Sequence, residues 1–215
     1  MSWISKTIIY QVVLLLAAIA GLVHYKKMDK ASRLLVWFIC STFLCEAIAV
    51  WFSLTYGNSL IVYHIYNPLQ LLLIALYFNF EIEYFYRKKI GWYLGIAGIM
   101  LSLFNSVFLQ SPFKVIDSNF LITESFIIIG LCLYSFYSLL LEDSVEDFFD
   151  SRFWFSSLLL IFWSFTFCYW LIGPTLYKTS PKTSEWLNVM IWAINVLCYS
   201  GFAIVFLSFR KMKKV

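Results

Sequence analysis

Seven long apolar runs dominate this 215-residue chain and leave little sequence for anything else. Each run is close to the ~20 apolar residues that an α-helix needs to cross the hydrocarbon core of a bilayer. The pattern therefore predicts an all-α membrane protein, a seven-transmembrane-helix bundle. The predicted spans cover approximately residues 7–25, 34–56, 60–80, 90–109, 120–141, 153–177 and 186–209.

Composition and connection lengths exclude a soluble catalytic domain. The chain is 62% hydrophobic and only 13% charged, whereas about a quarter of the residues in a soluble domain are charged. The connections between the apolar runs are short, so every helix packs against its neighbours in sequence. We therefore expect one seven-helix transmembrane domain over residues 1–215.

The distribution of Lys and Arg predicts how this bundle is oriented, because cytoplasmic loops retain positive charge during membrane insertion. Of the sixteen basic residues, twelve fall on one side of the predicted membrane and four on the other. This split predicts an outside N-terminus and a cytoplasmic C-terminus. The smaller, outer set consists of Lys6, Lys114, Lys178 and Lys182.

Ionisable and amide side chains inside the apolar runs are the main functional clue, because each costs a few kcal/mol in hydrocarbon unless it is paired. In the predicted orientation most of them lie in the outer half of the membrane, and the inner half is mainly apolar. This asymmetry predicts an outward-facing polar cavity. The candidate ligand-binding residues are Glu46, His64, Asn67, Gln70, Asn105, Glu124 and Asn195.

The predicted third span carries the densest group of these residues. Tyr63, Tyr66, Asn67 and Gln70 recur at helical spacing and therefore share one face of the helix. Such a face suits contact with a ligand, and it equally suits hydrogen bonds between helices. Pro68 removes a backbone donor within this group, which predicts a kink or a freed carbonyl beside it.

Glu46 is the one carboxyl predicted near the middle of the membrane. Intramembrane acids commonly carry protons or contact ligands, which gives Glu46 a functional interpretation. The structural interpretation is a hydrogen-bonded side chain that ties its helix to a neighbouring helix. The sequence leaves both interpretations open.

An acidic segment between the predicted fifth and sixth spans is the main feature of the cytoplasmic side. Acidic residues contribute little to topology, so the segment is free to serve another purpose. It suits a cytoplasmic protein partner with a basic surface or the basic C-terminal tail of the chain, and it equally suits a solvated connector. The candidate partner-binding residues are Glu142, Asp143, Glu146, Asp147 and Asp150.

Several kinds of chemistry are excluded or left without support by the motifs that the chain lacks. No Lys lies between Thr183 and Phe209, which excludes a retinal Schiff base on the last helix. His24 and His64 are the two histidines, and the five cysteines form no CxxC pair, so no metal site is predicted. No GxSxG or HExxH motif occurs. We therefore predict no cofactor and no catalytic residue. We also predict no nucleic-acid partner, because the membrane topology accounts for the basic residues.

Three segments together resemble small bacterial seven-helix proteins that have no assigned activity. They are Tyr63-His64-Ile65-Tyr66-Asn67-Pro68-Leu69, Arg152-Phe153-Trp154-Phe155 and Trp192-Ala193-Ile194-Asn195. The resemblance implies the same topology and a multi-pass location in the bacterial cytoplasmic (inner) membrane. Some of these proteins are similar in size to membrane accessories of signalling or phage-defence systems, which implies an accessory role as one expectation.

Three hypotheses of function follow from these features. The first is a receptor-like or signalling and defence accessory protein whose cavity takes a small polar or amphipathic ligand. The second is a proton-coupled transporter or channel for a small solute. The third is an intramembrane lipid-modifying enzyme, with Glu46 or Glu124 as the general base and His64 as the acid. In all three the lipid bilayer is a partner, and the aromatic-rich surface suits a homo-oligomer as well as lipid.

Overall fold

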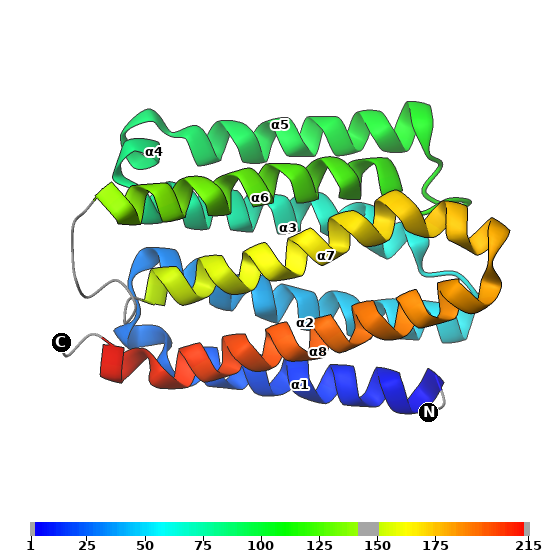
Figure 1. Cartoon of the computed structure of the whole chain (residues 1–215), viewed down its shortest axis with the longest axis horizontal. Helices are drawn as coiled ribbons and strands as arrows, with labels where there is room; N and C mark the ends of the chain where they lie inside the picture. The colour runs from blue at the N-terminus through cyan, green and yellow to red at the C-terminus, as the bar shows by residue number, and fades with distance from the viewer. Residues whose placement is uncertain (1–2, 142–150, 213–215) are drawn as a thin grey trace. The chain divides into compact units, whose positions relative to one another are not determined.

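The computed structural model describes residues 3–141 and 151–212, which are helical with short connections (Figure 1). Seven helices in these ranges are long and apolar enough to cross a membrane, which confirms the predicted class. They are α1 (Trp3–His24), α2 (Lys30–Tyr56), α3 (Leu60–Glu81), α5 (Ile90–Phe104) with the π-helical turn η2 (Asn105–Leu109), α6 (Ser118–Leu141), α7 (Ser151–Thr179) and α8 (Pro181–Met212). Two short helices, η1 (Tyr25–Lys27) and α4 (Glu83–Lys88), lie in the connections.

The helices extend beyond the predicted apolar runs because polar residues continue and cap them. Helix α2 begins at Lys30, where the Asp29 carboxylate accepts hydrogen bonds from the backbone N–H and the hydroxyl of Ser32. This N-cap supplies an acceptor that the first turn of a helix otherwise lacks. The same helix ends at Tyr56 and is capped by Gly57, whose φ of 72° is the left-handed conformation typical of the residue after a helix C-terminus.

Contacts within the chain divide it into two compact units. The central unit is Gly21–Phe120, and the terminal unit combines Met1–Ala20 with Leu121–Val215. The single domain expected over the whole chain stays a prediction, as does the orientation of the termini.

In the central unit, α3 packs against both α2 and α5. The neighbouring helices are antiparallel, since α3 residues 63 and 66 bond to α2 residues 46 and 42, in reverse order. Pro68 lies inside α3 without ending it. Close packing of α5 on α3 depends on glycine, because a methyl group at Gly91 would overlap the backbone carbonyl oxygen of Ala75. The Gly91 N–H donates to Asn79 Oδ1 at 3.1 Å, which joins the two helices at the same point.

In the terminal unit, α7 packs against α8. Phe155 stacks on Phe202 with ring centroids 5.9 Å apart. Hydrogen bonds between described residues also join α6 and α1 to this pair. Ser135 of α6 bonds to Ser156 of α7 at 3.0 Å, and Trp192 Nε1 of α8 donates to the carbonyl of Lys6 in α1 at 3.0 Å.

Large apolar side chains cover much of the exposed surface. Leu54, Val107, Phe126 and Leu140 are each more than two-thirds exposed. Exposed side chains of this kind suit the hydrocarbon of a bilayer, where they cost nothing. The seven apolar helices therefore support an integral, multi-pass membrane protein. The bacterial inner membrane stays a prediction.

Candidate functional site

A buried polar cluster in the central unit holds the loop of residues 110–117 against α3. We define the Asp117 cluster as Asp117, Asn67, His64 and Ser106. Asn67 Nδ2 donates to both carboxylate oxygens of Asp117, at 3.0 and 2.9 Å. His64 bonds through Nδ1 to the Ser106 hydroxyl and through Nε2 to the carbonyl of Val115, each at 2.9 Å. The cluster thus joins α3, the π-helical turn η2 and the loop.

The hydrogen-bond partners of His64 indicate which of its ring nitrogens carries a proton. A carbonyl oxygen only accepts, so the bond to Val115 requires a proton on Nε2. In the neutral ring Nδ1 then accepts from the Ser106 hydroxyl, and in the charged ring it donates to that oxygen. Both ring nitrogens are therefore occupied while the loop is in place.

Asp117 is the most unusual member of the cluster because its side chain is fully buried although it lies outside the spans. Burial raises the pKa of the Asp117 carboxyl above its ordinary value. The hydrogen bonds from Asn67, the nearby His64 and the backbone N–H of Asp117 itself act in the opposite direction. The carboxylate is therefore held by local donors against the cost of removing it from water.

Gln110 joins the two ends of the same loop. Its backbone N–H donates to the Asn105 carbonyl at 2.7 Å, which closes the π-helical turn η2. Its side-chain oxygen accepts from Asn105 Nδ2 and from the Asn119 N–H, and its amide donates to the Ser118 hydroxyl. Such π turns are rare in proteins, and those that occur often lie at functional sites. Asn105 Oδ1 is buried and has no hydrogen-bond partner within the described chain.

A further anchor lies on the exposed side of the loop. Asn58 Nδ2 donates to the Phe113 carbonyl at 2.9 Å. The Phe113 side chain itself is 66% exposed, and Val115 is about half exposed. Bonds at Phe113, Val115 and Asp117 therefore hold a surface loop whose last residue is buried.

Glu46 and Gln70 have a different setting within the central unit. Glu46 is half-buried and accepts a hydrogen bond from the Tyr63 hydroxyl at 3.1 Å. One turn away, the hydroxyls of Tyr66 and Thr42 bond to each other. These contacts tie α2 to α3, as the structural interpretation of Glu46 predicts. Gln70 is buried on α3.

The other two candidates, Glu124 and Asn195, lie in the terminal unit. Glu124 is fully buried in α6, and Asn195 is half-buried in α8. Asn195 Oδ1 is enclosed without a hydrogen-bond partner among the described residues, and so is Trp163 Nε1 of α7. Nearby on α8, Asn188 accepts from the Tyr169 hydroxyl at 2.7 Å and joins α8 to α7. Of the seven candidates, His64, Asn67 and Asn105 bond to the loop of residues 110–117. A ligand-binding role for the seven residues stays a prediction.

Sequence reasoning missed Asp117 because it considered only polar residues inside the apolar runs. A usable signal was present, since Asp117 directly precedes the polar start of α6. Acidic residues are favoured at helix N-termini, where they face free N–H groups. The acidic candidates Glu142, Asp143, Glu146, Asp147 and Asp150 lie outside the described residues.

The raised pKa of Asp117 predicts a particular dependence of stability on pH. The folded protein holds the Asp117 proton more tightly than the unfolded chain does. The free energy of unfolding should therefore fall as the pH rises from about 4 through the raised pKa of Asp117. Thermal unfolding in nanodiscs at a series of pH values measures this slope. Asp117→Asn should flatten it, whereas Glu83→Gln, at an exposed carboxylate of α4, should not; an unchanged slope in Asp117→Asn would contradict the assignment.

Comparisons with known protein families, with curated proteins and with solved structures find no match for this chain. Among the described residues, no three His, Cys, Asp or Glu side chains gather as metal ligands. The resemblance to small bacterial seven-helix proteins stays an expectation. Any proposal of function therefore depends on the geometry of the buried polar groups.

Proposed function

We propose that this chain is a receptor-like membrane protein whose Asp117 cluster takes a small amine. The observation that carries the proposal is a fully buried carboxylate on the last residue of a surface loop. A buried anion is stabilised most by a cationic hydrogen-bond donor. Asn105 Oδ1, buried without a partner among the described residues at the start of η2, supplies a further acceptor near the loop. A small polar or amphipathic ligand with an ammonium group matches this arrangement.

Binding at Asp117 is coupled to movement of the loop. The Asp117 side chain has no exposed surface, and displacement of residues 110–117 from α3 would break its bonds to Asn67 and open it to a ligand. A ligand that binds better to the displaced loop shifts the protein toward that state. This differential affinity is what a receptor requires.

Helix α6 offers a route from the loop to the acidic segment. Asp117 directly precedes its first residue, Ser118, and the segment of residues 142–150 directly follows its last residue, Leu141. A displaced loop therefore acts on one end of α6. A cytoplasmic partner bound at the acidic segment would respond to the resulting movement of α6, which is an accessory signalling role.

The proposal is tested by thermal unfolding of the protein in nanodiscs, with butylamine as the probe and butanol as the matched neutral control. Butylamine should stabilise the wild type, by about 2.7 kcal/mol at a hundred times its dissociation constant. Butanol should not, and Asp117→Asn should remove the amine response. Asn188→Ala, in the terminal unit, should keep it. Equal responses to both probes, or an amine response that survives in Asp117→Asn, would contradict the proposal.

Proton-coupled transport is the second candidate, and Glu46 is the observation that favours it. This half-buried carboxyl lies within the α2 span and accepts a hydrogen bond from the Tyr63 hydroxyl. Uptake of a solute into liposomes, driven by a pH gradient and lost in Glu46→Gln, would support transport over a receptor. The third hypothesis, a lipid-modifying enzyme with His64 as the acid, is less well supported because both ring nitrogens of His64 already have partners.

A further inference from the structure

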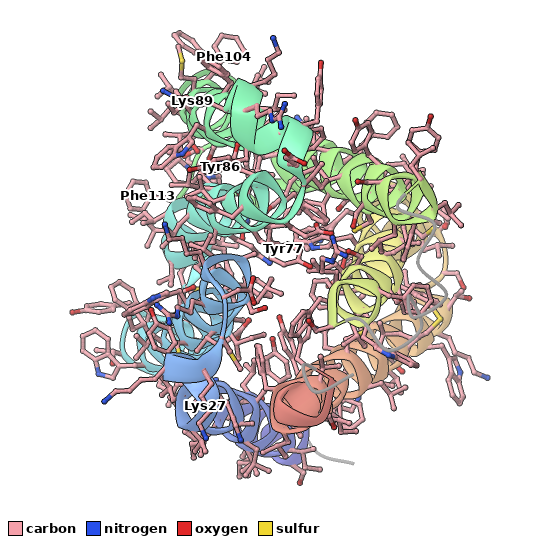
Figure 2. The ribbon with its side chains drawn as sticks, turned by 90° about the vertical axis from the view of Figure 1, so that its left-hand side faces the viewer. Lys27, Tyr77, Tyr86, Lys89, Phe104 and Phe113 are labelled. Atoms are coloured by element: carbon pink, nitrogen blue, oxygen red, sulfur yellow. The ribbon has the colours of Figure 1, made fainter. Side chains whose placement is uncertain are left out.

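Basic residues gather at one end of the central unit, where α2 begins and α3 ends. Antiparallel packing of α2 on α3 brings η1 and the start of α2 to the same end as α4. Figure 1 shows the turn before α2 and α4 at this end, and Figure 2 looks onto it, with Lys27, Tyr86 and Lys89 labelled. We define the basic end as Lys26, Lys27, Lys30, Arg33, Arg87, Lys88 and Lys89.

The turn that carries Lys26 and Lys27 is held in place by Arg33. Arg33 Nε donates to the carbonyl of Tyr25, and its terminal nitrogen donates to the carbonyl of Lys26, each at 3.2 Å. The guanidinium carbon lies 5.3 Å from the centroid of the Tyr25 ring, a cation–π distance. Trp37 Nε1 donates to the Tyr25 hydroxyl at 2.9 Å. Arg33 thus shapes the turn, and both lysines remain exposed.

The lysines of the basic end have no carboxylate partners in the part of the chain that the structure describes. Arg87 pairs with Glu83 on the same short helix, and Asp29 accepts from Ser32 at the start of α2. Lys26, Lys27, Lys30, Lys88 and Lys89 make no ion pair with a described residue, and all five are exposed. A concentration of unpaired positive charge attracts an anion from the surroundings.

The neighbouring side chains indicate at what depth in a bilayer the basic end would lie. Leu22 and Val23, in the turn of α1 that leads into η1, are both more than half exposed, as are Trp37 and Tyr86. Exposed tryptophan and tyrosine at the end of an apolar helix are typical of the headgroup level of a bilayer. A bilayer that covers the apolar helices would therefore place these lysines near its lipid phosphates, and clusters of four or more basic residues at this position favour anionic lipids.

We propose that the basic end binds the headgroup phosphate of an anionic phospholipid, with Lys26, Lys27 and Lys30 as the contacting side chains. The turn shaped by Arg33 presents the first two lysines, and Lys30 follows at the start of α2. The exposed ring of Trp37 packs beside the lipid. This site is independent of the amine site, because residues 110–117 follow the far end of α5 from Lys89.

The test is native mass spectrometry of the full chain released from nanodiscs that contain equal amounts of phosphatidylethanolamine and phosphatidylglycerol. The wild type should retain phosphatidylglycerol in preference to phosphatidylethanolamine. The triple variant Lys26→Gln, Lys27→Gln, Lys30→Gln should reduce that preference by about tenfold or more. The side chains of the three lysines are exposed and pair with no described carboxylate, and the bond from Arg33 reaches the backbone of Lys26, which the variant keeps, so the variant should unfold at the wild-type temperature.

The matched control is Lys6→Gln, Lys114→Gln, Lys182→Gln, which removes the same charge from the lysines predicted on the outer side and should keep the wild-type preference. An equal loss in this control, or no loss in the first variant, would overturn the proposal. A third variant replaces Glu142, Asp143, Glu146, Asp147 and Asp150 by their amides. It should bind lipid as the wild type does. A clear gain of phosphatidylglycerol would instead show that the chain's own acidic segment occupies the basic end.

Discussion

Gly91→Ala should destabilise the protein more than any other single methyl addition in the central unit. The new Cβ would overlap the Ala75 carbonyl oxygen and the Cβ of Asn79. Neither atom is the flexible end of a side chain, so neither can move away unless the backbone of α3 moves. Separating α3 from α5 would also stretch the hydrogen bond from Gly91 to Asn79. We expect a loss of about 3 kcal/mol, which exceeds the gain of about 1 kcal/mol that alanine brings to a helix.

The matched control for this prediction is Gly130→Ala in α6. A methyl group at Gly130 meets nothing within 4 Å, so this variant should be neutral or slightly more stable. Reversible unfolding in mild detergent by a chemical denaturant measures both variants. Equal stability of the two would show that α5 does not approach α3 as closely as the structure has it.

Asn67→Leu is the second large prediction, and it concerns the candidate site. The substitution removes the side chain that donates to both oxygens of the buried Asp117 carboxylate. Leaving a buried charged acceptor without its donor costs about 3 kcal/mol. We therefore expect a large loss of stability at neutral pH and a smaller loss at low pH, where Asp117 is protonated. The measurement is thermal unfolding at both pH values.

A double variant separates this electrostatic cost from simple loss of packing. Replacing both partners of a buried polar pair by apolar side chains is often nearly neutral. Asn67→Leu with Asp117→Leu should therefore be more stable than Asn67→Leu alone. A double variant that is less stable than the single one would mean that the leucine does not fit, and that the Asp117 charge is not the cause.

Helix positions could be predicted from this sequence because each span is a long apolar run. Runs such as residues 34–56 and 60–80 correspond closely to α2 and α3. The extension of α2 back to Lys30 was less predictable, since it depends on the cap at Asp29. The glycine face of α5 was visible as Gly91-x3-Gly95, although the sequence does not say which helix it meets.

The candidate site could be predicted only in part, because spacing along a helix does not show which way the helix is turned. His64 and Asn67 were identified by residue type and position, but their partners come from the loop and from η2. The π-helical turn depends on Gln110, whose bonds reach Asn119 on the next helix. Asp117 lies outside the spans and is buried only by tertiary packing, which no local pattern reveals.

Hydrogen exchange of the loop of residues 110–117 is the most direct test of the central claim that an amine at Asp117 displaces this loop. Exchange followed by mass spectrometry, in nanodiscs with and without butylamine, reports the Val115 and Asp117 amides. The account predicts faster exchange of this loop with butylamine in the wild type, and no change with butanol or in Asp117→Asn. Exchange that is equally slow with and without butylamine, at a concentration that stabilises the protein, would contradict it.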